Sequence, residues 1–212
     1  MIYEVVTYDL KPRTVPQAEL RFAAAYAERK RYSELVASWH TEFGPLNQIV
    51  QIWPYRDLAQ REEVGAAVTA AGCWPPDLSD VLVRRRTELM APVHFSPLLA
   101  AGSFGPFYEW RTYHIPPGTL DTMMGAWERA MPLRLAFGPV LAVWTTVIGS
   151  QELLTHIWPY RSLEQRQLIR EQLRASGQWP PFLMDEAAGG PGYDVLHQEN
   201  KLFVPATFSP LN

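Results

Sequence analysis

Residues 52–61 of the chain read IWPYRDLAQR, and residues 157–166 read IWPYRSLEQR. Eight of these ten positions are identical, and the second copy begins 105 residues after the first. Self-similarity at a fixed period is typical of repeated structural units. The sequence therefore predicts a first repeat at residues 1–100 and a second repeat at residues 106–212.

Further matches extend this duplication along most of the chain. Identical residues at the same offset include Tyr3 and Tyr108, Glu4 and Glu109, Trp39 and Trp144, and Trp74 and Trp179. The closing Phe-Ser-Pro-Leu of each repeat matches at a longer offset, so the second repeat contains eight extra residues. We place them in the glycine-rich stretch 186–193, which predicts an inserted loop able to act as a lid.

The composition excludes several classes of protein. The chain has 212 residues, 47% of them hydrophobic, and a net charge of −3, which is typical of a globular protein without a basic nucleic-acid surface. Apolar runs stay below the roughly 18 residues of a membrane span. The single cysteine, Cys73, excludes an internal disulfide and a cysteine-based zinc site. We expect a soluble cytoplasmic protein that binds neither nucleic acid nor membranes.

Each repeat alternates strand-like and helical segments in the same order. In the first repeat, alternating and β-branched residues predict strands, and 3.6-residue periodicity predicts helices. Asp57 is the expected N-cap of the second helix and Gly72 its C-terminal glycine. The expected elements are strand 3–10, helix 15–35, hairpin strands 36–43 and 48–55, helix 58–72 and strand 87–95.

This β-α-β-β-α-β order is the ferredoxin-like unit, an α+β fold. Its four-stranded sheet carries helices on one face, so the other face needs cover. We expect the two sheets of the chain to pack against each other as a pseudo-symmetric barrel, with helices outside and a cavity between the sheets. One chain then suffices to close the barrel, and further homo-oligomerisation stays open.

Several motifs together resemble one known family. They are Tyr-Glu-x-x-Thr-Tyr at 3–8, Trp-His-Thr-Glu-Phe-Gly at 39–44, Asn47 with Trp53 and Tyr55, and Pro-x-x-Phe-Ser at 92–96. They resemble the NIPSNAP family, and the likeness covers both halves as tandem domains. It implies a dimeric α/β-barrel fold and no defined activity. The wider superfamily contains cofactor-independent monooxygenases, haem-degrading enzymes and simple binding proteins.

Strand alternation sorts the candidate site residues into shared faces. Polar and aromatic side chains gather on one face of each predicted strand, and we expect these faces to line the cavity and bind a small organic molecule. The alternative is a closed interface in which the same polar groups satisfy one another. The predicted ligand-binding residues are Trp53, Tyr55, Glu109, Arg111, Tyr113, Trp158 and Tyr160.

Two histidines are candidates for chemistry. His156 shares a face with Trp158, and its ordinary pKa near neutrality suits a catalytic general base. Gln51 stands at the equivalent position of the first repeat, which indicates that one half is specialised. His40 and Glu42 point the same way along a strand and form a candidate secondary site, with a structural role as the alternative. We expect no cofactor and no metal, because no nucleotide-binding or metal-hydrolase motif is present.

Two functions remain open at this point. One is a small-molecule enzyme or binder, of cofactor-independent oxygenase or isomerase type, and the other is a protein-interaction scaffold with a filled barrel. Asymmetry between the repeats, such as the unpaired His156, favours the first. The arginines Arg61 and Arg166 occur in both copies, so we expect them to form ion pairs that stabilise the fold.

Overall fold

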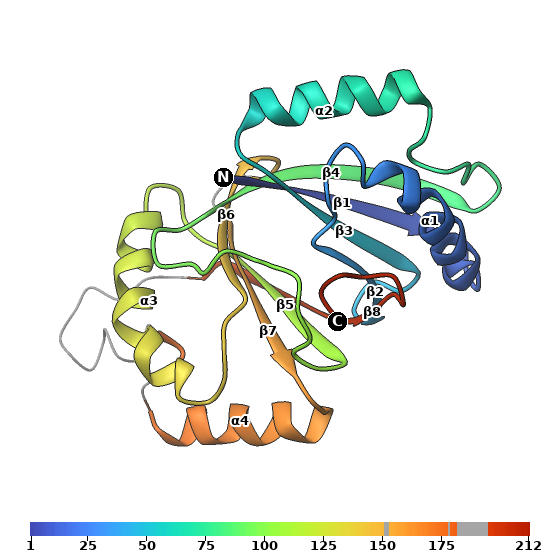
Figure 1. The fold of residues 1–212 in the computed structure, drawn as a ribbon. Coiled ribbons are helices and arrows are strands. Elements are labelled where there is room, and N and C mark those ends of the chain that lie inside the picture. Colours follow the sequence, from blue (N-terminus) through green and yellow to red (C-terminus); the bar gives the residue numbers. More distant parts are fainter. Residues whose placement is uncertain (151–152, 178, 182–194) are drawn as a thin grey trace.

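The computed structural model describes residues 1–150, 153–177, 179–181 and 195–212 (Figure 1). The first half contains β1 (Ile2–Leu10), α1 (Val15–Arg29), β2 (Ala37–Phe43), β3 (Gln48–Tyr55), α2 (Leu58–Ala71) and β4 (Leu82–Pro92). The second half contains β5 (Phe107–His114), α3 (Leu120–Leu135), β6 (Ala142–Ile148), β7 (Leu153–Tyr160), α4 (Leu163–Ala175) and β8 (His197–Pro205). The predicted β-α-β-β-α-β order is confirmed in both halves. The predicted loop at 186–193 lies outside the described residues.

The strands form one closed antiparallel barrel in the order β1-β3-β2-β8-β5-β7-β6-β4. Two seams join the halves: β2 pairs with β8, where Thr41 lies opposite Phe203, and β4 pairs with β6, where Ala91 lies opposite Thr145. Closure leaves no unpaired sheet edge. The barrel therefore closes within a single chain, as the duplication predicts.

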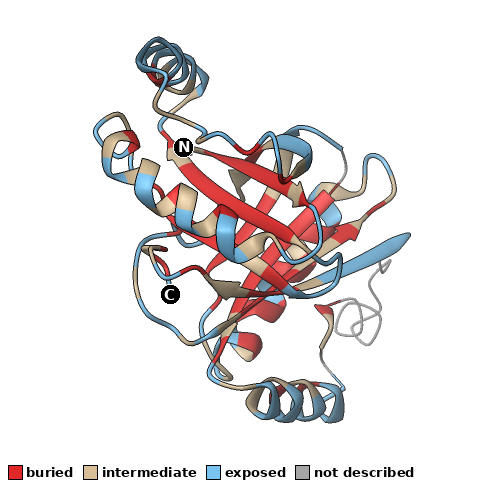
Figure 2. Cartoon of the chain, turned by 90° about the vertical axis from the view of Figure 1, so that its right-hand side faces the viewer, coloured by how far each residue is buried: buried red, intermediate tan, exposed pale blue. Residues whose placement is uncertain are grey.

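Aromatic side chains from both halves fill the barrel interior. Tyr3 stacks on Trp144 with ring centroids 4.5 Å apart, and Trp39 stacks on Tyr108 at 4.6 Å. The repeat relates one pair to the other, and each pair joins residues of opposite halves. The strands are accordingly the most buried part of the molecule (Figure 2). A cavity of about 140 Å³ remains at the end of the barrel where β5 finishes and β8 begins.

The helices lie outside the barrel, two over each sheet (Figure 1). Helices α1 and α2 pack on the outer face of the first sheet, and α3 and α4 on that of the second. The predicted caps are confirmed, since the Asp57 side chain accepts a hydrogen bond from the Gln60 main-chain N–H, and Gly72 adopts a left-handed φ of 61°. Ser162 caps α4 in the same manner.

Two element boundaries differ from expectation. Helix α1 ends at Arg29 and not near residue 35, because the chain folds back and the Leu35 N–H donates to the Tyr26 hydroxyl at 3.1 Å. Strand β4 begins at Leu82 and not at residue 87. The intervening arginines stay in the strand because they find partners across it, as Arg84 does with Asp9 at 2.7 Å.

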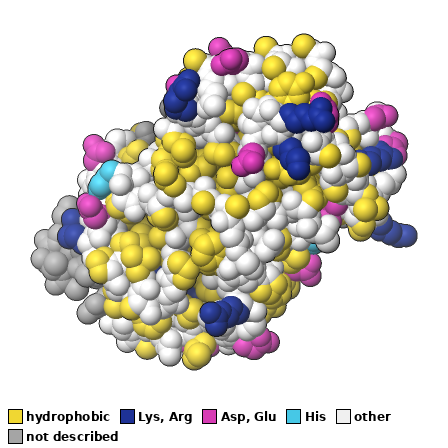
Figure 3. Space-filling view, in the orientation of Figure 1, with side chains coloured by type: hydrophobic (Ala, Val, Ile, Leu, Met, Phe, Trp, Pro, Cys, Tyr) yellow, Lys and Arg dark blue, Asp and Glu magenta, His cyan; other side chains and the backbone are white. Residues whose placement is uncertain are grey.

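On the face of the molecule seen in Figure 3, hydrophobic side chains are interspersed with small groups of charged ones. None of the helices in the described part of the chain is both long and apolar enough to cross a membrane.

Candidate functional site

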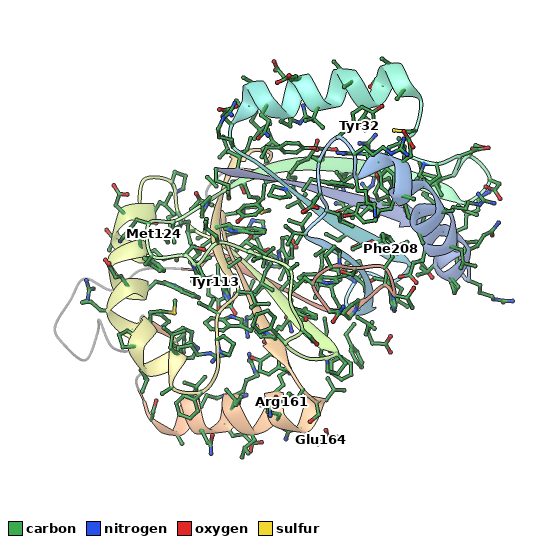
Figure 4. All side chains as sticks on the ribbon, in the orientation of Figure 1. Tyr32, Tyr113, Met124, Arg161, Glu164 and Phe208 are labelled. Carbon is green, nitrogen blue, oxygen red and sulfur yellow. The ribbon has the colours of Figure 1, made fainter. Side chains whose placement is uncertain are left out.

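The predicted site residues of the second repeat lie on the outer face of the barrel, beneath α3 and α4. This corrects the expectation that they line the space between the sheets. Alternation separated the two faces correctly, but the face carrying Tyr108 and Trp110 turns inward, because the interior of an eight-stranded barrel must be filled by side chains. Tyr113 shows the outcome, since it lies between β5 and α3 (Figure 4).

The structure brings six of the predicted residues together around one pocket of about 220 Å³. These are Glu109, Arg111, Tyr113, His156, Trp158 and Tyr160. Helices α3 and α4 add cationic side chains to the wall, and Trp179 adds a ring; the helical contributors are Arg134, Arg170, Leu173 and Arg174. Trp53 and Tyr55 occupy the equivalent place under α1 and α2 and do not reach this pocket.

Glu109 is 1% exposed and neutralises part of this positive charge. Arg166 donates to it through Nε at 3.1 Å and also through Nη2, and the Nη1 atoms of Arg170 and Arg111 lie 3.8 and 4.0 Å away. The Tyr160 hydroxyl donates to the second carboxylate oxygen at 3.2 Å. Burial and the Glu109 charge raise the pKa of Tyr160 to about 12, which keeps this donor protonated. The ion pair expected for Arg166 is confirmed.

Arg134 lies over the ring of Trp158, with its guanidinium carbon 3.8 Å from the ring centroid, and donates to the Tyr160 hydroxyl at 3.3 Å. The first repeat builds the same arrangement from Arg29, Trp53 and Tyr55. The two copies differ in the contacts of the guanidinium group. Nη1 of Arg29 donates to the Ser33 hydroxyl at 2.8 Å, whereas Gly138 stands at that position in the second repeat. Among the described residues, Nη1 of Arg134 is buried without an acceptor.

His156 is 1% exposed and surrounded by aromatic rings. Burial, reinforced by the charges of Arg111, Arg134 and Arg170, lowers the pKa of His156 well below its ordinary value, so the imidazole is neutral. The Trp158 indole N–H donates to its Nδ1. In a neutral ring with Nδ1 accepting, Nε2 carries the proton. The geometry thus favours a hydrogen-bond donor over the general base suggested by the sequence.

A pH prediction follows from this neutral histidine. The unfolded chain takes up a proton near the ordinary histidine pKa of about 6.5, whereas the folded protein does not, so the free energy of unfolding falls as pH drops below that value. His156→Gln, which installs the Gln51 residue of the first repeat, removes this dependence. We expect wild type to lose about 1.4 kcal/mol per pH unit more than the variant over the titration window. Urea unfolding at pH 7.0, 6.0 and 5.0 measures it, and parallel curves for the two proteins would refute it.

Three buried nitrogen donors around the pocket have no acceptor within the described protein: Nε of Arg111, Nη1 of Arg134 and Nε2 of His156. An unsatisfied buried donor costs about 1–3 kcal/mol. Burial lowers the pKa of Arg134 and of Arg170, and the charges of neighbouring arginines lower both further. An anionic group placed between these donors would accept their hydrogen bonds and would also offset the excess positive charge.

The first repeat lacks this concentration of charge. Its pocket, of about 680 Å³, keeps Glu4 and the Arg61 that pairs with it. Four charged or polar positions of the second repeat are exchanged, with Val6, Gln51, Gly65 and Thr69 in place of Arg111, His156, Arg170 and Arg174. Arg170 and Arg174 were not among the predicted site residues. Their four-residue spacing at positions 166, 170 and 174, which places them on one helix face, was the available signal.

The candidate secondary site does not assemble as predicted. Nδ1 of His40 lies 2.8 Å from a carboxylate oxygen of Glu19 on α1, and Glu42 is exposed to solvent. The Glu19 carboxylate raises the pKa of His40. His40 is therefore oriented by a residue from a helix, and Glu42 takes no part in that contact.

Several known proteins are similar to the chain. Protein NipSnap homolog 3B of Homo sapiens is 29% identical over 99% of this chain and 85% of its own length. Protein NipSnap of Drosophila melanogaster is 27% identical over 99% of this chain and 78% of its own. Two solved structures share the fold at low identity. A monooxygenase-like protein of Lactobacillus acidophilus has a TM-score of 0.64 at 12% identity, covering 97% of this chain and 94% of that one.

The second solved structure is that of an anthrone oxidase-like protein. It has a TM-score of 0.61 at 9% identity and covers 98% of this chain and 94% of that one. At these identities the likeness shows the dimeric α/β-barrel fold alone. The sequence profile of the NIPSNAP family matches twice, at residues 3–97 and 108–210. These two matches cover most of the chain. The chain therefore belongs to the NIPSNAP family, with two of its domains in tandem.

Proposed function

We propose that the protein binds a small organic anion in the pocket between the second sheet and helices α3 and α4. One observation carries the proposal: three buried donors, on Arg111, Arg134 and His156, line the same cavity and lack acceptors among the described residues. Hydrogen bonds from charged donors to an anion are among the strongest available in proteins. A carboxylate offers four lone-pair positions and fits such a set.

The pocket walls favour an aromatic ligand of one ring. Tyr113, Trp158 and Trp179 supply ring surfaces, and few aliphatic side chains reach the cavity. Its volume of about 220 Å³ lies below the roughly 300–1,000 Å³ of pockets that hold drug-sized molecules. Arenecarboxylic acids of the size of benzoate or its hydroxy derivatives match both the ring surfaces and the donors.

Binding has more support than catalysis. Among the described lining residues, Glu109 and His156 could take a proton from a ligand, and both are engaged: Glu109 is held by Arg166, and Nδ1 of His156 accepts from Trp158. The same donors would, however, stabilise negative charge that develops on an oxygen atom. A cofactor-independent oxygenase or isomerase acting on a ligand that ionises readily is the reaction type that this donor set would serve.

The test is binding of benzoate, compared with uncharged benzamide. Wild type is expected to bind one equivalent of benzoate and to gain melting temperature, while benzamide does neither. Arg111→Val installs the Val6 residue of the first repeat and should weaken binding by about 10–100-fold, the value of a charged hydrogen bond. Isothermal titration calorimetry measures both affinities.

The matched control is Arg85→Gln, which removes a cation from the first-repeat pocket and installs the Gln198 residue of the second. It should leave benzoate binding unchanged. Equal losses in the two variants would mean that the anion binds elsewhere. If neither benzoate nor its hydroxy derivatives bind, the interaction scaffold takes the place of the binding function.

We also propose that the protein is a monomer and that it works in the cytoplasm. The barrel closes within one chain, so a partner copy is not needed to complete the fold. Cys73, the only cysteine, is a free thiol, which agrees with a reducing compartment. Light scattering at several concentrations tests the oligomeric state.

A further inference from the structure

A second group of polar side chains lies at one end of the barrel, away from the anion pocket. Strands β5 and β8 pair there, with His114 opposite His197 and Thr112 opposite Glu199. Paired residues share a face, and residues two apart along a strand do as well. The register thus gathers two imidazoles and one carboxylate on the inner face of the barrel.

The ligand atoms of these residues are close together. Nε2 of His114 lies 3.5 Å from Oε1 of Glu199, the two histidine rings are 5.2 Å apart between centroids, and all three ligand atoms lie within 4.8 Å of one another. Two ligands bound tetrahedrally to zinc at about 2.0–2.1 Å are roughly 3.3–3.4 Å apart. The His114–Glu199 separation is close to that value before any adjustment of the half-exposed side chains.

We propose that His114, His197 and Glu199 form a site for a divalent transition-metal ion, with zinc as its representative. Two imidazoles and one carboxylate are a known protein ligand set for such ions. Three protein ligands leave a fourth coordination position open to water or to a small anion. The proposal does not depend on the anion pocket, which lies on the opposite face of the same sheet.

At the equivalent positions, the first repeat has ion pairs that stabilise the strands and cannot bind a metal. The equivalents of His114, His197 and Glu199 are Asp9, Arg84 and Arg86. Nε of Arg84 lies 2.7 Å from Asp9, and Nη2 of Arg86 lies 3.5 Å from it. That trio is a complete ion-pair cluster, and its two cations exclude a metal. The second repeat has metal-ligating side chains in place of both arginines and the aspartate. A single pair of oppositely charged residues would be enough to stabilise the two strands, so the replacement of all three favours a metal site.

The cavity of about 140 Å³ gives the proposed ion access to a ligand. His114 and Glu199 line it, together with Thr7, Thr112 and the cationic Lys201. Arg86 and Glu88 complete the charged part of its wall, so the cavity is polar and holds side chains of both signs. Water or a small anion in this cavity can therefore occupy the fourth coordination position.

Zinc titration of the untagged, full-length protein by calorimetry tests the proposal. We expect one equivalent of Zn²⁺ to bind, and His197→Ala and Glu199→Gln each to lower its affinity by at least about tenfold. Both residues are exposed, so the variants should keep the melting temperature of the metal-free protein. The control is His94→Ala. His94 pairs with Glu128 at 3.1 Å on the surface without a second histidine, and its loss should leave zinc binding unchanged.

Cobalt absorption separates this cluster from other zinc-binding groups. Co²⁺ bound by His114, His197 and Glu199 should give visible bands in wild type and in Cys73→Ser, and none in His197→Ala. Failure of wild type to bind zinc would overturn the proposal. So would zinc binding that survives His197→Ala and Glu199→Gln, or that is lost in Cys73→Ser or His94→Ala.

Discussion

Replacing Glu109 with glutamine is expected to lower the free energy of unfolding by about 3–5 kcal/mol. The carboxylate is 1% exposed, and three arginines, Arg166, Arg170 and Arg111, lie within 4.0 Å of one of its oxygens. Glutamine keeps the size of the side chain but removes its charge, which leaves buried cations uncompensated. Urea unfolding at neutral pH measures the loss.

The first repeat supplies the control in Glu4→Gln. Glu4 pairs with Arg61, whose side chain is 36% exposed, so water can compensate for the lost charge. We expect a smaller effect of about 1–2 kcal/mol. Equal effects at the two positions would contradict the view that only the second repeat concentrates positive charge.

Truncating Trp39 to alanine should cost about 3–5 kcal/mol of stability. Its ring is fully buried, stacks on Tyr108 of the other half, and donates through Nε1 to the Leu211 carbonyl at 3.0 Å. Because the strands of the two halves form one barrel, both halves should still unfold in a single transition. Circular dichroism and tryptophan fluorescence should therefore give coincident curves.

Trp144→Phe is the milder companion variant. Trp144 stacks on Tyr3 in the equivalent place, but its Nε1 has no hydrogen-bond partner among the described residues, so phenylalanine removes volume without breaking a bond. Its cost should stay below that of Trp39→Phe by about 1 kcal/mol. Two separate transitions in either variant would show that the halves fold independently, against the shared barrel.

Much of the fold could be predicted from the duplicated motif. The identical Trp-Pro-Tyr-Arg stretches showed which residues of the two halves are equivalent. Capping residues such as Asp57 marked helix starts correctly. The local sequence pattern gave the wrong element boundary where a residue distant in the sequence stabilises the strand. The arginines at positions 84–86 look like a solvated charge run, yet Asp9 on the neighbouring strand keeps Arg84 within β4.

The sequence predicted most of the residues of the candidate site correctly but placed the site on the wrong face of the sheet. Alternation grouped His156, Trp158 and Tyr160 on one face correctly, yet the choice of face depends on which side chains fill the barrel. Aromatic residues such as Tyr108 and Trp144 fill it, which sends the polar face outward to the helices. The group of His114, His197 and Glu199 could not be found from the sequence, because it exists only through the register of β5 and β8.

Asymmetry between the repeats supports a specialised second half. The shared frame of Arg, Trp and Tyr stabilises both helix–sheet interfaces, as Arg29 and Arg134 show by stacking on equivalent tryptophans. The exchanges at Arg111, His156, Arg170 and Arg174 gather around one cavity. Gly138 in place of Ser33 removes a hydroxyl acceptor, and the donor without an acceptor among the described residues is Nη1 in Arg134 but Nε in Arg29.

The nitrogen resonances of His156 test the anion-binding account most directly. Two-dimensional ¹H–¹⁵N spectra at neutral pH, with His156→Gln identifying the signals, should show a neutral ring protonated on Nε2. Benzoate should shift that Nε2–H signal in a saturable manner in wild type and much more weakly in Arg111→Val. A ring protonated on Nδ1, or an Nε2–H signal that benzoate leaves in place, would contradict the account.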